Sequence, residues 1–125
     1  MAYTTIDDPE AYFQTVVYTG NGSADHAITL DGDTDMQPDL VWIKNRDATD
    51  SPCLFDAVRG ATKILTTDSE DAEATDADTL DSFTSDGFQV DADVKVNTNT
   101  EKYVAWCWKE SAASGLDILT YTGNA

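Results

Sequence analysis

The chain has 125 residues, of which 41% are hydrophobic and 10% aromatic, and its 24 acidic and 7 basic side chains give a net charge of −17. This length suits one domain with a single core, and the apolar content excludes a disordered tail. The negative charge repels phosphate backbones and anionic lipid headgroups, so we expect neither a nucleic-acid partner nor a membrane surface.

Short runs of β-branched and aromatic residues fill the first half of the chain. Residues 12–19 end at a Gly-Asn-Gly turn, and residues 26–30 form the next run. Residues 40–45 are apolar on both faces, which is typical of a central strand. Residues 53–56 and 63–66 follow as two more short runs. We therefore expect five strands in this half.

An acidic stretch at residues 68–81 separates the two halves. Half of its residues are acidic and only Leu80 is large and apolar. The composition favours a solvated loop over a helical turn at 70–74. Residues 82–84 and 87–90 then predict two strands around a tight turn.

The last third of the chain contains one weak and one strong strand signal. Residues 91–99 are polar and predict a connection with a weak strand at its centre. Residues 103–109 are the most strand-like segment of the chain. Val104, Trp106 and Trp108 share the heavier of its two faces, so we expect these three side chains in the core, together with Trp42.

About eight short strands with acidic loops between them predict an all-β fold. No segment longer than ten residues has the 3.6-residue period of a helix. The fold class that fits is an antiparallel β-sandwich or jelly roll.

The C-terminal end of the chain repeats part of its beginning. Residues 15–22 return as residues 118–125 with four identical positions, Tyr-Thr-Gly-Asn. Coincidence and the start of a second tandem module both explain this repeat. We expect the following segments: a β-sandwich module at 1–110 with an N-terminal arm at 1–10, a linker at 111–115, and a C-terminal strand at 116–125.

The sequence contains no motif for catalysis. The one histidine, His26, lies in a short strand run without a nucleophile motif around it. A polysaccharide-degrading enzyme needs a carboxyl in an apolar cleft, and only Asp39 and Asp56 lie beside apolar runs. Cys53 and Cys107 are expected as buried thiols, with a disulfide as the alternative. We therefore expect a protein that is not an enzyme.

One acidic loop has the spacing of a metal site. Asp31, Asp33 and Asp35 stand at alternate positions, which is how calcium loops arrange their carboxylates. The loop departs from the EF-hand pattern, because Gly32 is second instead of sixth and Trp42 stands where a bidentate Glu is needed. A Ca²⁺ site and a solvated acidic turn without any cofactor both remain open.

Four motifs occur in one order along the chain. They are QPDLVWIKNR at 37–46, LFDAVRG at 54–60, SFTSDGF at 82–88 and YVAWCWK at 103–109. This set resembles a module of uncharacterised tailed-phage virion proteins, common in marine phages and often found in tandem. The resemblance covers residues 11–109, and Leu40 departs from it by standing in an aromatic position.

The resemblance implies a β-sandwich, concanavalin- or SPRY-like, that is built into a virion. Such a module is assembled in the host cytoplasm and then exposed outside the cell on a tail fibre, tail spike or capsid. Its expected partners are other virion subunits, in a homo-oligomer, and host surface carbohydrate. A purely architectural or capsid-decoration role is the alternative. The resemblance brings no catalytic residues.

Carbohydrate binding requires aromatic and amide side chains around one pocket. Asn45, Arg46 and Trp108 lie in the four motifs, and Asn97 lies in the connection before the last one; together they supply these groups. We therefore expect these four residues to bind the ligand if the module is an adhesin.

Overall fold

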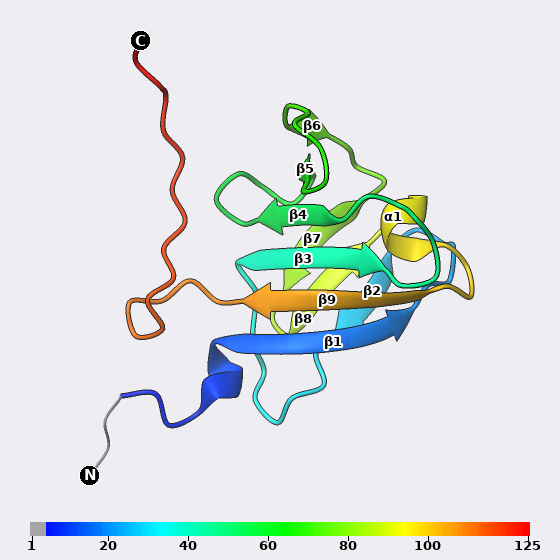
Figure 1. Ribbon diagram of the computed structural model, residues 1–125. Helices are drawn as coiled ribbons and strands as arrows, with labels where there is room; N and C mark the ends of the chain where they lie inside the picture. Colours follow the sequence, from blue (N-terminus) through cyan, green and yellow to red (C-terminus); the bar gives the residue numbers. More distant parts are fainter. Residues whose placement is uncertain (1–4) are drawn as a thin grey trace.

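The computed structural model describes residues 5–125 and contains two antiparallel sheets that face each other (Figure 1). The larger sheet has the strand order β1-β9-β3-β4-β5-β6, and the smaller has the order β2-β8-β7. In chain order the elements are η1 (Pro9–Ala11), β1 (Phe13–Thr19), β2 (His26–Thr29), β3 (Leu40–Asn45), β4 (Cys53–Asp56), β5 (Lys63–Thr66), β6 (Ala74–Thr75), β7 (Leu80–Thr84), β8 (Gly87–Val90), α1 (Val94–Asn97) and β9 (Lys102–Trp108). The predicted all-β sandwich is confirmed.

Most strands form where the residue pattern predicts them. The bounds of β3, β4, β5 and β8 agree with the prediction, and those of β1, β2, β7 and β9 differ by one or two residues. β3 lies inside the larger sheet between β9 and β4, as its two apolar faces predicted. The acidic stretch at 68–81 is mainly loop, also as predicted, with the two-residue β6 paired to β5.

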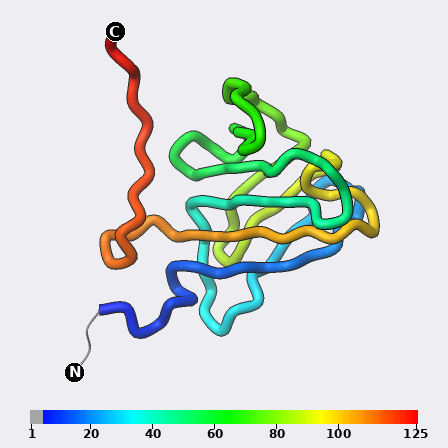
Figure 2. The backbone as a smooth tube through the Cα atoms, viewed as in Figure 1, coloured from blue at the N-terminus to red at the C-terminus, as the bar shows by residue number. Residues whose placement is uncertain are grey.

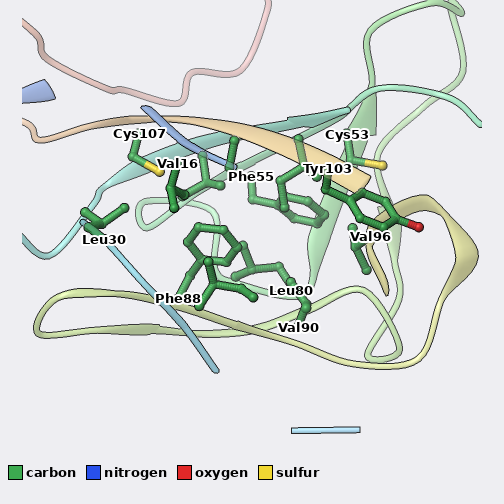
Figure 3. Packing of buried hydrophobic residues seen from close by; sticks show 14 of the residues in the cluster. Val16, Leu30, Cys53, Phe55, Leu80, Phe88, Val90, Val96, Tyr103 and Cys107 are labelled. Carbon is green, nitrogen blue, oxygen red and sulfur yellow. The ribbon is translucent and has the colours of Figure 1, made fainter. Parts of the chain in front are cut away.

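The core lies between the two sheets, and Figure 3 shows its packing. Phe88, Leu80 and Val90 come from the smaller sheet, and they face Phe55 and Tyr103 of the larger sheet. All five side chains are fully buried. Burying apolar surface on this scale is the main source of stability for a domain of this size.

The predicted core face of β9 is the wrong one. Tyr103, Ala105 and Cys107 are buried, whereas Val104, Trp106 and Trp108 point to the other side and are partly exposed. Trp42, opposite Trp106 in the register, is 37% exposed, so it is not a core residue either. The larger sheet has one face against the smaller sheet and leaves the other uncovered, so side-chain size alone did not identify the buried face.

The polar region 91–99 forms a short helix instead of the predicted weak strand. α1 begins after Asp93, whose side chain accepts a hydrogen bond from the Lys95 backbone N–H at 2.8 Å. Aspartate is a preferred residue at this capping position. The helix buries Val96 and Asn97 against the end of the core.

The chain enters and leaves the sandwich at the same end (Figure 2). Phe13 of β1 pairs with Trp108 of β9, and the Lys109 N–H donates to the Tyr12 carbonyl at 2.8 Å. Beyond an isolated bridge between Ser111 and Leu116, residues 117–125 run without assigned secondary structure. The predicted strand at 116–125 is thus not formed here, and a second tandem module stays a prediction. None of the helices in the described residues is long and apolar enough to cross a membrane.

Candidate functional site

The four predicted ligand residues do not meet in one pocket. Asn45 and Arg46 lie at the end of β3 that pairs with Tyr103, whereas Trp108 pairs with Leu40 at the opposite end. Asn45 and Asn97 are almost fully buried and cannot contact a ligand at the surface. Only Arg46 is exposed, with Trp108 partly so.

Asn97 holds the turn after β1 in place. Its side-chain oxygen accepts from the Asn21 N–H at 2.9 Å and lies 2.8 Å from His26 Nδ1. Its amide nitrogen donates to the Asn21 side chain and to the Ser23 carbonyl. A buried amide with all its partners satisfied is a structural residue.

Asn45 organises the loop after β3 in the same manner. Its amide nitrogen donates to Asp50 and Glu101 at 2.8 and 2.6 Å, and its oxygen accepts from the Asp47 N–H. The Tyr103 hydroxyl lies 3.2 Å away. These bonds use the hydrogen-bonding capacity that a sugar would need.

The three aspartates of the predicted calcium loop do not form a metal-binding group. Asp31, Asp33 and Asp35 are all exposed. Within residues 5–125, no cluster of three or more His, Cys, Asp or Glu side chains is placed to hold a metal ion. The loop is fixed by other means, since the Gly32 and Asp33 N–H groups donate to Gln14 and Glu10. Calcium binding there stays a prediction without a preformed site.

The two carboxyls beside apolar runs have structural partners. Asp56 pairs with Arg59 at 2.5 Å, and Arg59 also reaches Glu73 at 3.1 Å. The Asp39 carboxylate accepts the Glu110 N–H at 2.8 Å. These contacts explain the positions of both carboxyls without a role in catalysis.

The outer face of the larger sheet carries large apolar side chains. Residues directly opposite each other in an antiparallel sheet share a face, and Thr15, Trp106 and Trp42 form one such row. The ring centroids of Trp42 and Trp106 are 5.2 Å apart. Those of Phe13 and Trp108, in the neighbouring row, are 5.1 Å apart. We call this surface the aromatic face; its apolar members are Phe13, Val17, Leu40, Trp42, Leu54, Leu65, Val104, Trp106 and Trp108.

The aromatic face is almost free of negative charge. Among the described residues of β1, β9, β3, β4 and β5, the one carboxylate is Asp56, which is buried against Arg59. Lys44, Lys63 and Lys102 alternate outward on the same strands. In a chain with 24 acidic side chains, this face stands apart from the rest of the surface. Exposed aromatic side chains gathered on one face are typical of interaction surfaces.

The outer face of the smaller sheet is different. Its outward residues include Ala27, Thr29 and Gln89, and Gln89 donates to Asp25 and Asp81. It carries no large exposed hydrophobic side chain among the described residues. The two sides of the sandwich are therefore chemically distinct, and one of them provides a control for the other.

A hollow of about 260 Å³ lies at one end of the aromatic face. Tyr12, Phe13 and Trp108 line it together with Lys109 and Leu116. Trp108 is the one predicted ligand residue in this hollow. Sequence reasoning missed Phe13, because an exposed and a buried strand aromatic look the same in a sequence.

Burial raises the pKa of both cysteine thiols to about 12. Cys53 and Cys107 are free and buried, which confirms the expected pair of buried thiols. Burial also raises the pKa of Tyr18, whose ring stacks on Tyr103 with centroids 5.1 Å apart. A buried thiol with a raised pKa is a poor nucleophile, so these residues serve packing.

A family model described as a domain of unknown function, DUF7483, matches residues 8–125. The chain belongs to the DUF7483 family. The match includes all strands of this DUF7483 chain and the segment after β9. No curated protein and no solved structure matches it. The DUF7483 description names no ligand or reaction, so the aromatic face and the hollow are the features from which a function can be argued.

Proposed function

We propose that the protein is a non-catalytic structural module of a tailed-phage virion, and that neighbouring copies associate through the aromatic face. The observation that carries this proposal is the uncovered row of aromatic side chains on a sheet face with almost no carboxylates. The virion assignment rests on the four ordered motifs at 37–46, 54–60, 82–88 and 103–109.

Electrostatics favours a second copy at this face. Two chains that each carry a net charge of −17 repel each other over most of their surfaces. The aromatic face carries lysines instead of exposed carboxylates, so two copies approach there with the least repulsion. Burying Trp42 and Phe13, 37% and 41% exposed, then adds a hydrophobic gain.

The face has few groups that suit a sugar across its centre. Apart from the buried Asp56, its outward polar side chains are threonines and lysines, for example Thr15 and Lys102, and they include no asparagine or glutamine. Carbohydrate sites combine aromatic rings with amide and carboxylate groups that bind hydroxyls. The centre of the face thus fits a protein contact better.

Sedimentation analysis of the full chain tests the proposal. We expect concentration-dependent association that strengthens with added NaCl, because salt screens the repulsion. Trp42→Gln is expected to weaken association at least about tenfold, as truncation of a central aromatic residue does at other interfaces. The matched control is Thr29→Gln, an exposed position on the outer face of the smaller sheet.

Two results would contradict association through this face. One is a wild-type chain that stays monomeric at high protein concentration in salt. The other is an equal loss of association in the Trp42→Gln and Thr29→Gln variants. Circular dichroism of both variants checks that each remains folded.

The hollow beside Trp108 favours a second candidate function, binding of a host surface glycan. Tyr12, Phe13 and Trp108 offer ring faces there, and Lys109 offers a charged donor. A glycan array with the full chain tests this function. Reproducible binding that Trp108→Ala removes and Trp42→Gln leaves intact would support it; an array without binding would contradict it.

The virion assignment has its own test. Mass spectrometry of purified particles from the encoding phage should detect the chain in fixed proportion to the known structural subunits. Its absence from the particles would contradict the assignment, whatever the oligomeric state.

A further inference from the structure

The C-terminal segment repeats the residues that β1 needs to pack. Residues 121–124 are identical to residues 18–21, Tyr-Thr-Gly-Asn, which form the end of β1 and the turn after it. Leu119 and Tyr121 are 68% and 87% exposed, and the segment has no strand partner in the described part of the chain. A segment that copies a half-buried strand but is itself exposed lacks a packing site for its apolar side chains.

The contacts of Tyr18 explain why β1 has a tyrosine at this position. Its ring stacks on Tyr103 with an angle of 13° between the planes. Its hydroxyl donates to the Val96 carbonyl at 2.8 Å. Tyr121 carries the same ring and the same donor.

The surroundings of Gly20 explain why a glycine is needed at this position. A Cβ atom at Gly20 would collide with the Thr98 carbonyl oxygen, so other residues do not fit without a shift of the backbone. The Gly20 N–H donates to the Glu101 carbonyl at 2.8 Å, which ties the strand end to the start of β9. Gly123 supplies the same small residue, and nothing lies within 4 Å of its own Cβ position.

Asn21 and Val16 also have counterparts in the C-terminal segment. Asn21 exchanges two hydrogen bonds with Asn97, and Asn124 has the same side chain. Val16 is 4% exposed in the core, and Leu119 stands at the corresponding position. The segment thus carries the core residue and the stacking ring of β1, and the glycine and the amide of the turn after it.

The segment is also long enough to reach the place that β1 occupies. Phe13 pairs with Trp108, so Leu116 would stand opposite Trp108 in the same register. A loop of residues 110–114 would then reverse the chain. The isolated bridge between Ser111 and Leu116 has a different register, so it would open when the segment takes this place. Hairpin loops of about five residues are common.

We propose that residues 116–124 are a second β1-type strand that recognises β9 of this fold, so that two segments of one chain compete for a single position. β1 holds the position in the structure. Gln14 explains its advantage, because its amide donates to the Glu10 and Thr34 carbonyls. Asp117 stands at the corresponding position of the segment, and its carboxylate cannot donate. This proposal concerns strand pairing and does not depend on the proposed function.

A double-mutant cycle in the full chain tests the competition. Gly20→Val prevents β1 from packing at its place beside β9, and Gly123→Val prevents the C-terminal segment from packing there. We expect Gly123→Val alone to leave the melting temperature unchanged, since its side chain enters open space. We expect Gly20→Val to remain folded with the segment in the place of β1. In the Gly20→Val background, Gly123→Val should lower the melting temperature by about 10 °C or more, or prevent folding.

Each outcome of the cycle decides the question. Coupling between two glycines about a hundred residues apart supports the exchange. An equal, small effect of Gly123→Val in both backgrounds overturns it, and so does a Gly20→Val chain as unfolded as the double variant. Hydrogen exchange gives a second measurement: in the Gly20→Val chain, protection should move from residues 13–19 to residues 116–122. Unchanged protection of residues 13–19 would also overturn the proposal.

Discussion

Within residues 5–125, every buried side-chain nitrogen and oxygen has a hydrogen-bond partner. Asn45 and Asn97 are such residues, yet the sequence suggested them as surface ligands. Their partners come from distant segments, such as Glu101 for Asn45. A sequence without tertiary contacts cannot distinguish an amide that binds a ligand from one that binds the backbone.

The buried ion pair between Arg59 and Asp56 should contribute strongly to stability. The side chains are 13% and 8% exposed, so removing one partner leaves a poorly solvated charge. We expect Arg59→Ala to lower the free energy of unfolding by about 3 kcal/mol in urea denaturation. The control is Lys95→Ala, since its more exposed pair with Asp93 should be worth less than about 1 kcal/mol. Equal losses in the two variants would contradict this prediction.

The two buried thiols predict a loss of stability in alkali. Their pKa is about 12 in the folded chain against an ordinary value of 9.0. The unfolded thiols of Cys53 and Cys107 therefore lose protons first. Their contribution is fully present below pH 9 and falls between pH 9 and pH 12, with a slope of at most about 1.4 kcal/mol per pH unit for each thiol.

Chemical denaturation at several pH values measures this slope. We expect a variant with Cys53→Ala and Cys107→Ala to be less stable at pH 7 but to depend less on pH between 9 and 12. Tyr18 and Tyr103, whose pKa values are raised mainly by burial, remain in both proteins, so the part of their pH dependence that does not come from the thiols cancels in the comparison. Identical slopes would show that the thiols do not contribute.

At the scale of the elements, the strands were predictable and the faces of the sheet were not. Short apolar runs bounded by turn residues located β3, β4, β5 and β8 to the residue, because turn chemistry and β propensity are local. The orientation of β9 depends on which side of the larger sheet is covered by the smaller one. That is a property of the whole fold, and so Trp106 was assigned to the wrong side. α1 was missed for a related reason, since four residues are too few to show a helical period.

The turn between β7 and β8 should depend on one glycine. Gly87 has a φ of 135°, and a Cβ there would collide with the Ile28 carbonyl oxygen on β2. We expect Gly87→Ala to destabilise the fold by about 3 kcal/mol or more in thermal or urea unfolding. Gly115→Ala is the matched control, because Gly115 has a φ of 79° with nothing within 4 Å. Its cost should be about 1 kcal/mol, from backbone strain alone.

At the scale of the whole molecule, the acidic side chains and the apolar surface of the larger sheet lie in different regions. The carboxylates lie mainly in loops such as residues 68–81, while the large sheet is nearly free of them. We expect the melting temperature to rise by several degrees between about 10 mM and about 500 mM NaCl, because the Debye length falls from about 30 Å to below 10 Å. A melting temperature that stays constant or falls would contradict this.

The same experiment with calcium addresses the loop at 31–35. At equal ionic strength, screening predicts nearly equal melting temperatures in NaCl and CaCl₂. A bound ion would raise the value further by mass action, and Asp33→Asn would remove that increase. Such an increase would support the predicted calcium site at Asp31, Asp33 and Asp35, and equal melting temperatures would contradict it.

The pairing of Phe13 with Trp108 also sets how the module responds to a pulling force. Tension applied between the segments before β1 and after β9 would act at that pair first, across the direction of the strands. The hydrogen bonds between β1 and β9 would then break one pair at a time, instead of bearing the force together. Strands that separate in this way yield at a lower force than strands loaded along their length, so the module would extend under low tension.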